Sequence, residues 1–289
     1  LQLTLMRTHL SADSTVNAFA LSHIYNSAYG TNQFTDGNAG IQSKDYSQMV
    51  LGAGWKLNVQ ESVRACTLAD TAATYYVYLD ADGTEHYFSR ENESAPYKDE
   101  DGLGLTLTIS GTTFTITDKS DNQRIFYNGY LSEIRDSNGN SIYIAYNESS
   151  DHVLADFSPT ATAWRPNASG NRITSIYRKN DGASTEWLVS FSWDSSNRLS
   201  SVTDKLKNKT TNFYYTTING AAFLTGISAL SSTTYRVRYV YHSTANGGRL
   251  KEAYDAEAKR GVEYTYTQYG YDGWDVYRIA EYYAASYTG

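Results

Sequence analysis

The five histidines are the first residues to consider for catalysis or metal binding. His9, His23, His86, His152 and His242 are scattered along the chain, with no His-Glu-x-x-His segment and no cysteine cluster beside them. Neither a Gly-x-Ser-x-Gly segment nor a P-loop occurs. The sequence therefore predicts no metal centre, no cofactor and no catalytic residue, and we expect a protein that is not an enzyme.

Acidic residues leave two kinds of chemistry open. Asp80 and Asp82, or Asp99, Glu100 and Asp101, have the oxygen ligands that Ca²⁺ prefers, but neither group continues into a complete twelve-residue calcium loop. The alternative interpretation is an Asp-Gly turn and a solvated acidic loop. A hydrolase with two carboxylates across a cleft also stays open, because a sequence does not reveal their separation.

Aromatic residues dominate the composition, with 27 Tyr, 9 Phe and 5 Trp making up 14% of the 289 residues. Pairs of the Tyr-x-Tyr type recur at a fixed spacing, so we interpret them first as packing between hairpins and second as platforms for sugar rings. A less regular group near the C-terminus is our candidate binding surface, namely Tyr269, Tyr271, Trp274 and Tyr277.

The overall charge excludes several classes of partner. With 24 Lys and Arg against 31 Asp and Glu the net charge is −7, which disfavours nucleic acid and anionic membrane surfaces. No apolar run is long enough to span a bilayer, and no signal peptide is visible. The single Cys66 rules out a disulfide framework within the chain. Because the chain starts at Leu1 rather than Met, we expect a fragment of a longer protein.

The second half of the chain is an internal repeat. An apolar-x-x-apolar pattern follows a turn at Leu131, Ile173, Leu199, Leu224, Leu250 and Val276, and from Ile173 onward the steps are 25 or 26 residues. The longer step after Leu131 predicts an insertion near 148–170. Such regularity indicates a stack of similar units.

Each unit reads as one β-hairpin. In Gly129–Asn147 a short strand is followed by Asp-x-x-Gly-Asn and then by an alternating strand. Asn138-Gly139 is typical of a two-residue turn in which both residues adopt positive φ. The residues that define the repeat are Leu131, Asp136, Gly139, Tyr146, Leu199, Asp204, Leu250 and Asp255.

These patterns predict an all-β protein, built as a repeat array of antiparallel β-hairpins that forms a curved, spiralling sheet. Residues 1–128 would be an N-terminal β region that opens the array, and residues 129–289 the repeats of about 26 residues. A hairpin is unstable alone, so neighbouring units must bury a shared aromatic stripe.

Gly129–Asn147 resembles the tyrosine–aspartate (YD) repeat of Rhs proteins, bacterial wall-associated proteins, Tc toxins and teneurins. Two segments of the first half are similar to the region that opens such arrays: Ile24–Gly30 with Leu51–Trp55, and Tyr78–Phe88. The resemblance covers essentially the whole chain. It implies a partial β-shell that is secreted or cell-wall associated in bacteria. In toxin members of this family the shell encloses a C-terminal toxic domain.

The resemblance implies a non-enzymatic structural segment of such a shell. The expected partners are other repeats of the parent chain, an enclosed toxin domain or a surface glycan, with no nucleic acid and no membrane span. The shell hypothesis predicts an uncovered concave face and unpaired strand edges. The alternative is an adhesion or carbohydrate-binding β domain that uses exposed Tyr and Trp platforms.

Overall fold

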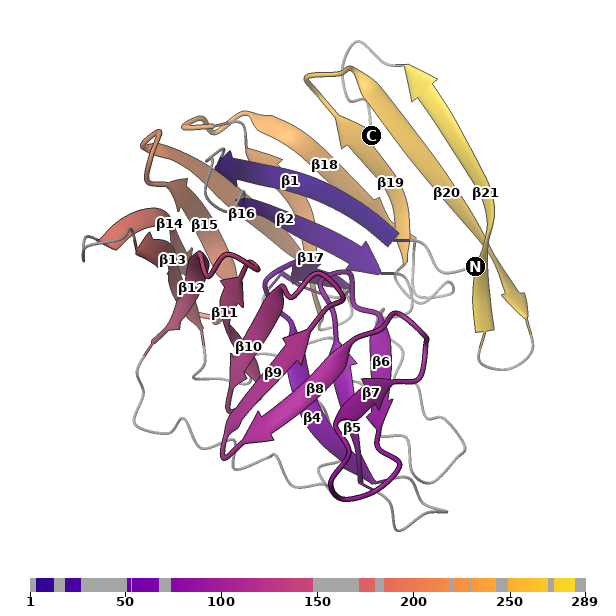
Figure 1. Cartoon of the computed structure of the whole chain (residues 1–289). Coiled ribbons are helices and arrows are strands. Elements are labelled where there is room, and N and C mark those ends of the chain that lie inside the picture. Colours follow the sequence, from indigo (N-terminus) through magenta and orange to yellow (C-terminus); the bar gives the residue numbers. More distant parts are fainter. Residues whose placement is uncertain are drawn as a thin grey trace.

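The computed structural model describes residues 4–12, 19–26, 51–52, 54–67, 74–147, 172–179, 185–218, 221–228, 230–242, 249–269 and 273–283. Every regular element in these ranges is a β-strand, and all strand pairings are antiparallel (Figure 1). The expected all-β architecture is confirmed. In the same ranges no helix is long and apolar enough to cross a membrane.

A small closed barrel precedes the repeats along the chain. Its strands are β4 (Ser62–Thr67), β5 (Thr74–Leu79), β6 (Glu85–Ser89), β7 (Tyr97–Asp99), β8 (Thr106–Ser110), β9 (Thr113–Thr117), β10 (Gln123–Tyr127) and β11 (Tyr130–Arg135). Each strand pairs with the next, and β11 returns to β4 through the pair Tyr130 and Ser62. Two backbone hydrogen bonds support this seam, from Val63 N to Gly129 O (2.9 Å) and from Leu131 N to Glu61 O (3.3 Å).

The repeat sheet grows out of the barrel from β11. It continues through β12 (Ser141–Tyr146), β13 (Ile173–Lys179), β14 (Thr185–Trp193), β15 (Leu199–Asp204), β16 (Lys209–Ile218), β17 (Ala221–Ser228), β18 (Tyr235–Tyr241), β19 (Leu250–Asp255), β20 (Arg260–Tyr269) and β21 (Gly273–Tyr283). The strands fan around in a curve (Figure 1). Strand β11 therefore belongs to both the barrel and the repeat sheet.

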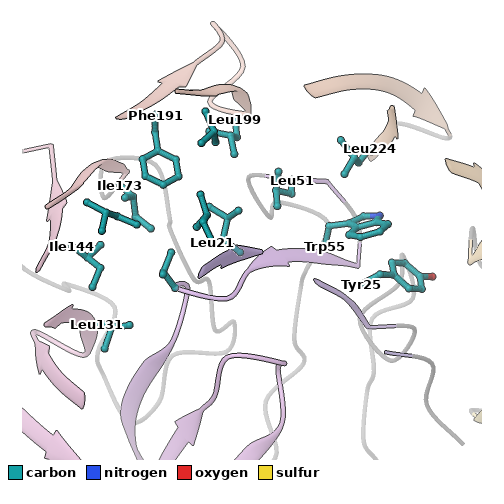
Figure 2. Close-up of a cluster of buried hydrophobic side chains, with 14 of the residues drawn as sticks. Leu21, Tyr25, Leu51, Trp55, Leu131, Ile144, Ile173, Phe191, Leu199 and Leu224 are labelled. Atoms are coloured by element: carbon teal, nitrogen blue, oxygen red, sulfur yellow. The ribbon is translucent and has the colours of Figure 1, made fainter. Parts of the chain in front are cut away.

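A separate three-stranded sheet is formed by β1 (Thr4–Ala12), β2 (Phe19–Asn26) and β3 (Trp55–Leu57). It lies inside the curve, against β17–β19 (Figure 1). Figure 2 shows Leu21, Leu51 and Trp55 of this region facing a row of repeat residues. That row is completely or almost completely buried and contains Leu131, Ile144, Ile173, Leu199 and Leu224.

The inner face of the curve is therefore the hydrophobic core, and the expectation of an uncovered concave face is wrong for this part of the sheet. Leu21, Leu51, Trp55 and Leu57 are all 0% exposed. A curved sheet must bury one apolar face against another layer. The chain supplies that layer from its own first strands, which an argument based on the repeats alone did not include.

The hairpin turns follow one pattern, although not the one predicted. At Asp136–Asn140 only Gly139 has a positive φ (87°), so the two-residue turn with positive φ at both Asn138 and Gly139 is wrong. Asp136 N instead donates to Asn140 O (3.0 Å) and Gly139 N to Asp136 O (3.0 Å). The Asp136 carboxylate accepts from the amides of Asn138 (2.9 Å) and Asn140 (2.8 Å). The aspartate therefore shapes a wider loop by hydrogen bonding to its backbone.

The same loop occurs at other hairpins. Its fourth residue is left-handed in each, at Gly83, Asp121, Gly139 and Asn197. Glycine, Asn and Asp are the residues that adopt this conformation at lowest cost. Asp204 and Asp255 begin turns one residue longer, which end at the left-handed Asn208 and Lys259.

Candidate functional site

The repeat is locked by one hydrogen bond that recurs five times in the described units. In each unit an aromatic residue on the second strand donates its side-chain proton to the carbonyl of the buried residue that opens the same unit. The pairs, which we call latches, are Tyr146 to Leu131 (2.8 Å), Trp193 to Ile173 (3.0 Å), Tyr215 to Leu199 (2.6 Å), Tyr241 to Leu224, and Tyr266 to Leu250 (2.7 Å).

The latches explain why a leucine and an aromatic residue recur in register. A buried backbone carbonyl needs a donor, and the phenol or indole provides both this donor and a large apolar ring. Burial raises the pKa of Tyr146, Tyr215, Tyr241 and Tyr266, so these phenols stay protonated and keep donating. Repetition of these aromatic pairs is thus accounted for by packing and hydrogen bonding.

Replacing one latch tyrosine tests this account. Tyr215→Phe keeps the ring but leaves the Leu199 carbonyl without its donor, so we expect it to lower the free energy of unfolding by about 1–2 kcal/mol. Tyr127→Phe is the control, because Tyr127 is 55% exposed. Equilibrium urea unfolding measures both, and equal effects of the two variants would contradict the latch.

The N-terminal sheet contacts the same latches. Trp55 Nε1 donates to the hydroxyl of Tyr241 (2.8 Å), which itself donates to Leu224 O. In the next unit of the array, the hydroxyl of Tyr25 accepts from Leu250 N (2.8 Å). The Trp55 ring lies 4.5 Å from that of Tyr239, centroid to centroid. The first strands therefore bind two successive units through the residues that lock those units.

Gly52 allows the chain to approach this closely. Its φ is +83°, and a Cβ atom there would lie 2.7 Å from the carbonyl oxygen of Ala222. Any side chain would collide with backbone, so only glycine fits without movement. Gly52 thus marks a close contact between two backbones.

A buried ionic cluster lies beside the seam of the small barrel. Glu61 is 3% exposed and accepts from the hydroxyl of Tyr78, and its Oε2 is 3.0 Å from Arg124 Nε. Burial raises the pKa of Glu61, and the charge of Arg124 partly offsets this. The cluster connects the residue before β4 to β5 and β10, so it stabilises the closed barrel next to its seam.

Lys56 is the most deeply buried cation described, at 1% exposure. Its ammonium group donates to the carbonyl oxygens of Asp80 and Ala81 (2.9 Å to the latter). Burial lowers the pKa of Lys56 from 10.5 to about 8, although Glu61, Asp80 and Asp82 counteract this.

This depressed pKa predicts a pH dependence. The folded state disfavours the charged ammonium, so the contribution of Lys56 to stability is present above pH 10.5 and is lost as the pH falls through about 8. Relative to Lys56→Met, the wild type should therefore gain about 2 kcal/mol between pH 8 and pH 10. Chemical denaturation at several pH values measures the difference, and the exposed Lys205→Met is the control. A difference that does not change with pH would contradict the shift.

The carboxylates considered for calcium are engaged by protein donors. Oδ1 of Asp80 accepts from the amides of Asp82, Gly83 and Thr84 at 2.8–3.0 Å. Its Oδ2 lies 3.1 Å from Nε2 of His86. This arrangement is an aspartate-stabilised turn. Within the described ranges no group of three or more His, Cys, Asp or Glu residues is placed to hold a metal ion.

His86 is held between two carboxylates. Its Nδ1 is 2.8 Å from Oδ2 of Asp101, and its Nε2 faces Asp80. Burial lowers the pKa of His86, but the hydrogen bonds and charges of Asp80 and Asp101 outweigh burial and raise it. Because both ring nitrogens are engaged, His86 is not positioned to take a proton from a hydroxyl nucleophile.

The aromatic cluster proposed as a binding surface lies largely beyond what the structure describes. Tyr271 is outside the described residues. Tyr269 ends β20 and pairs with Gly273, while Trp274 on β21 pairs with Gln268 on β20. Tyr277 also lies on β21, as the extra residue of the bulge opposite Thr265 and Tyr266. Only the strand backbone is described at these three positions.

A different aromatic row lies on the outer face of β12–β14. Tyr143 pairs with Tyr177, and Tyr177 pairs with Trp187, which is 50% exposed. The Tyr143 and Tyr177 rings stack with centroids 5.2 Å apart, and those of Tyr177 and Trp187 are 5.1 Å apart. Sequence reasoning missed this row, although Tyr143 lies between the buried Ile142 and Ile144 and must therefore face outward.

Comparisons with known proteins do not place the chain in a family. No family model matches it, and no curated protein matches it. A porin-like protein from Bacteroides uniformis ATCC 8492 is 11% identical, with a TM-score of 0.34 over 78% of this chain and 96% of that chain. The N-terminal domain of the effector protein SpvB from Salmonella typhimurium strain LT2 is also 11% identical, with a TM-score of 0.35 over 96% of this chain and 99% of that chain. The all-β architecture therefore rests on the strands of the chain itself.

Proposed function

We propose that this chain is a non-enzymatic structural segment of a secreted or cell-surface bacterial protein, and that it forms part of the wall of a β-shell built from YD-type repeats. The observation that carries the proposal is the latch, which gives each unit a buried leucine or isoleucine and an aromatic residue bonded across it. Such units add one hairpin at a time to a continuous wall. The shell would enclose a C-terminal toxin or effector of the parent protein.

The N-terminal sheet has a specific role in this proposal. The inner, apolar face of a curved repeat sheet must be covered by another layer. Strands β1–β3 cover the inner face of β18 and β19 through Trp55 and Tyr25, and Leu21 faces the buried row that contains Ile144 and Ile173. We assign them the role of an internal cap, so the enclosed partner would occupy space beyond the capped strands.

The experiment is protease protection of the complete parent protein. Purified parent protein is treated with a broad-specificity protease, and the fragments are identified by mass spectrometry. The proposal expects the sequence that follows these repeats to resist digestion, and to become sensitive when Trp55→Ala loosens the cap. Equal sensitivity in both proteins, or no domain beyond the repeats, would overturn the shell role.

The second candidate is an adhesion or carbohydrate-binding β domain. The observation that favours it is Trp187, which is half-exposed at the end of a row of aromatic side chains. Exposed aromatic rows on a rigid sheet are a common basis for binding. A panel of immobilised glycans tests this candidate, and a complete lack of binding would remove it.

A further inference from the structure

The outer row on β12–β14 is not required by the repeat. Counting three residues back from each latch aromatic gives Tyr143 in the first unit but Ser190, Asn212, Arg238 and Glu263 in the others. These positions face away from the core, and four of the five are polar. Packing of the repeat therefore does not explain why position 143 is a tyrosine.

The row ends in charged and polar groups. On the next strand, Glu133 pairs with Tyr143 and its Oε1 is 2.8 Å from Nη2 of Arg135. Lys179 is exposed, and its Nζ lies 5.4 Å from the centroid of the Tyr143 ring. Among the described residues no carboxylate is paired with Lys179. The surface thus combines aromatic rings, one balanced ion pair and the exposed ammonium group of Lys179, which pairs with no carboxylate in the part of the chain that the structure describes.

We propose that Tyr143, Tyr177, Trp187 and Lys179 form a binding site for an acidic glycan, a polysaccharide whose sugar rings carry carboxylates. The apolar C–H face of a sugar ring complements the negative face of an indole, and the free side of Trp187 is available for it. The sugar carboxylate complements Lys179. The pair of Glu133 and Arg135 supplies an acceptor and a donor for hydroxyl groups.

Charge complementarity selects the acidic glycan over a neutral one. The chain as a whole has a net charge of −7 and is repelled by a polyanion. Retention by an acidic polysaccharide would therefore report a local site rather than general attraction. The inference rests on the second of the two proposed functions and is independent of the shell role.

Affinity electrophoresis of the full chain tests the site. Native gels contain polygalacturonate, alginate or neutral laminarin at graded concentrations. We expect retardation in at least one acidic polysaccharide, weakened about tenfold by Trp187→Ala and about threefold by Lys179→Gln. Tyr127→Ala, an exposed aromatic outside the row, is the matched control and should bind as the wild type does.

The possible outcomes are separable. No retardation in any acidic gel, or equal retardation in laminarin, would overturn the inference. Acidic-glycan binding that is insensitive to Trp187→Ala would also overturn this site, while leaving an adhesive function elsewhere on the chain. Circular dichroism checks that each variant is folded. If the Trp187→Ala variant does not fold, Lys179→Glu is tested in its place, because Lys179 is exposed. This variant should abolish retardation in the acidic gels.

Discussion

Trp55→Ala is expected to lower the free energy of unfolding by about 3–5 kcal/mol, the largest effect of any single substitution at the junction. Trp55 is 0% exposed, and its ring lies against those of Tyr239, Tyr25 and His23. Its removal leaves a cavity between the N-terminal sheet and the repeats. It also removes the donor to the Tyr241 latch.

Equilibrium urea unfolding of two further variants shows how much of this loss comes from the indole hydrogen bond and how much from burial of the ring. Trp55→Phe keeps an aromatic ring and loses the indole donor, so it should cost less than Trp55→Ala. Trp187→Ala removes the same type of residue from a half-exposed position and should change stability by less than about 1 kcal/mol. Similar losses for the two alanine variants would show that the N-terminal sheet does not contribute to a common core.

Glu61→Ala is the second substitution with a large expected effect, a loss of about 1–3 kcal/mol. It removes the buried carboxylate and leaves the buried Tyr78 hydroxyl and the Arg124 guanidinium, whose side chain is 37% exposed, without their acceptor. Uncompensated buried polar groups are costly, whereas the intact pair itself adds little. The effect should also reach the seam, because Glu61 O accepts from Leu131 N.

The chain contains a matched control for this prediction. Arg236 Nε lies 3.0 Å from Oε2 of Glu257, the same distance as in the pair of Arg124 and Glu61. The Glu257 side chain is 71% exposed, compared with 3% for Glu61. Glu257→Ala should therefore cost less than about 1 kcal/mol. Comparable losses for the two variants, measured by chemical denaturation, would show that burial does not govern the Glu61 cluster.

The part of the fold that the sequence predicts correctly is local. Leu131 and Tyr146 lie on adjacent strands of one hairpin, so alternation and a repeated turn place both on the same face. The turn geometry was wrong at Asn138 because Asp136 uses its carboxylate to build a wider loop. Period and composition identify a hairpin but do not distinguish its turn types.

Contacts between distant segments were not predictable. Nothing in the pattern around Trp55 or Tyr25 identifies Tyr241 and Leu250 as partners, because docking of one sheet on another depends on the curvature of the whole array. The outer row was missed for a related reason. Tyr143 and Tyr177 flank the predicted insertion near 148–170, so the register between their strands cannot be counted from the sequence.

The contacts of the N-terminal sheet have a consequence for biosynthesis. Tyr25 binds a residue 225 positions later, and His23 and Trp55 bind residues 216 and 186 positions later. On the ribosome β1–β3 emerge before β17–β19, and the sequence separation means that roughly 200 residues must follow them before their binding surface is complete. The nascent chain therefore carries the apolar face of Trp55 without its partner Tyr241 while the intervening residues are made. Such distant pairing makes the final docking slow and leaves these strands exposed to aggregation until the array is complete.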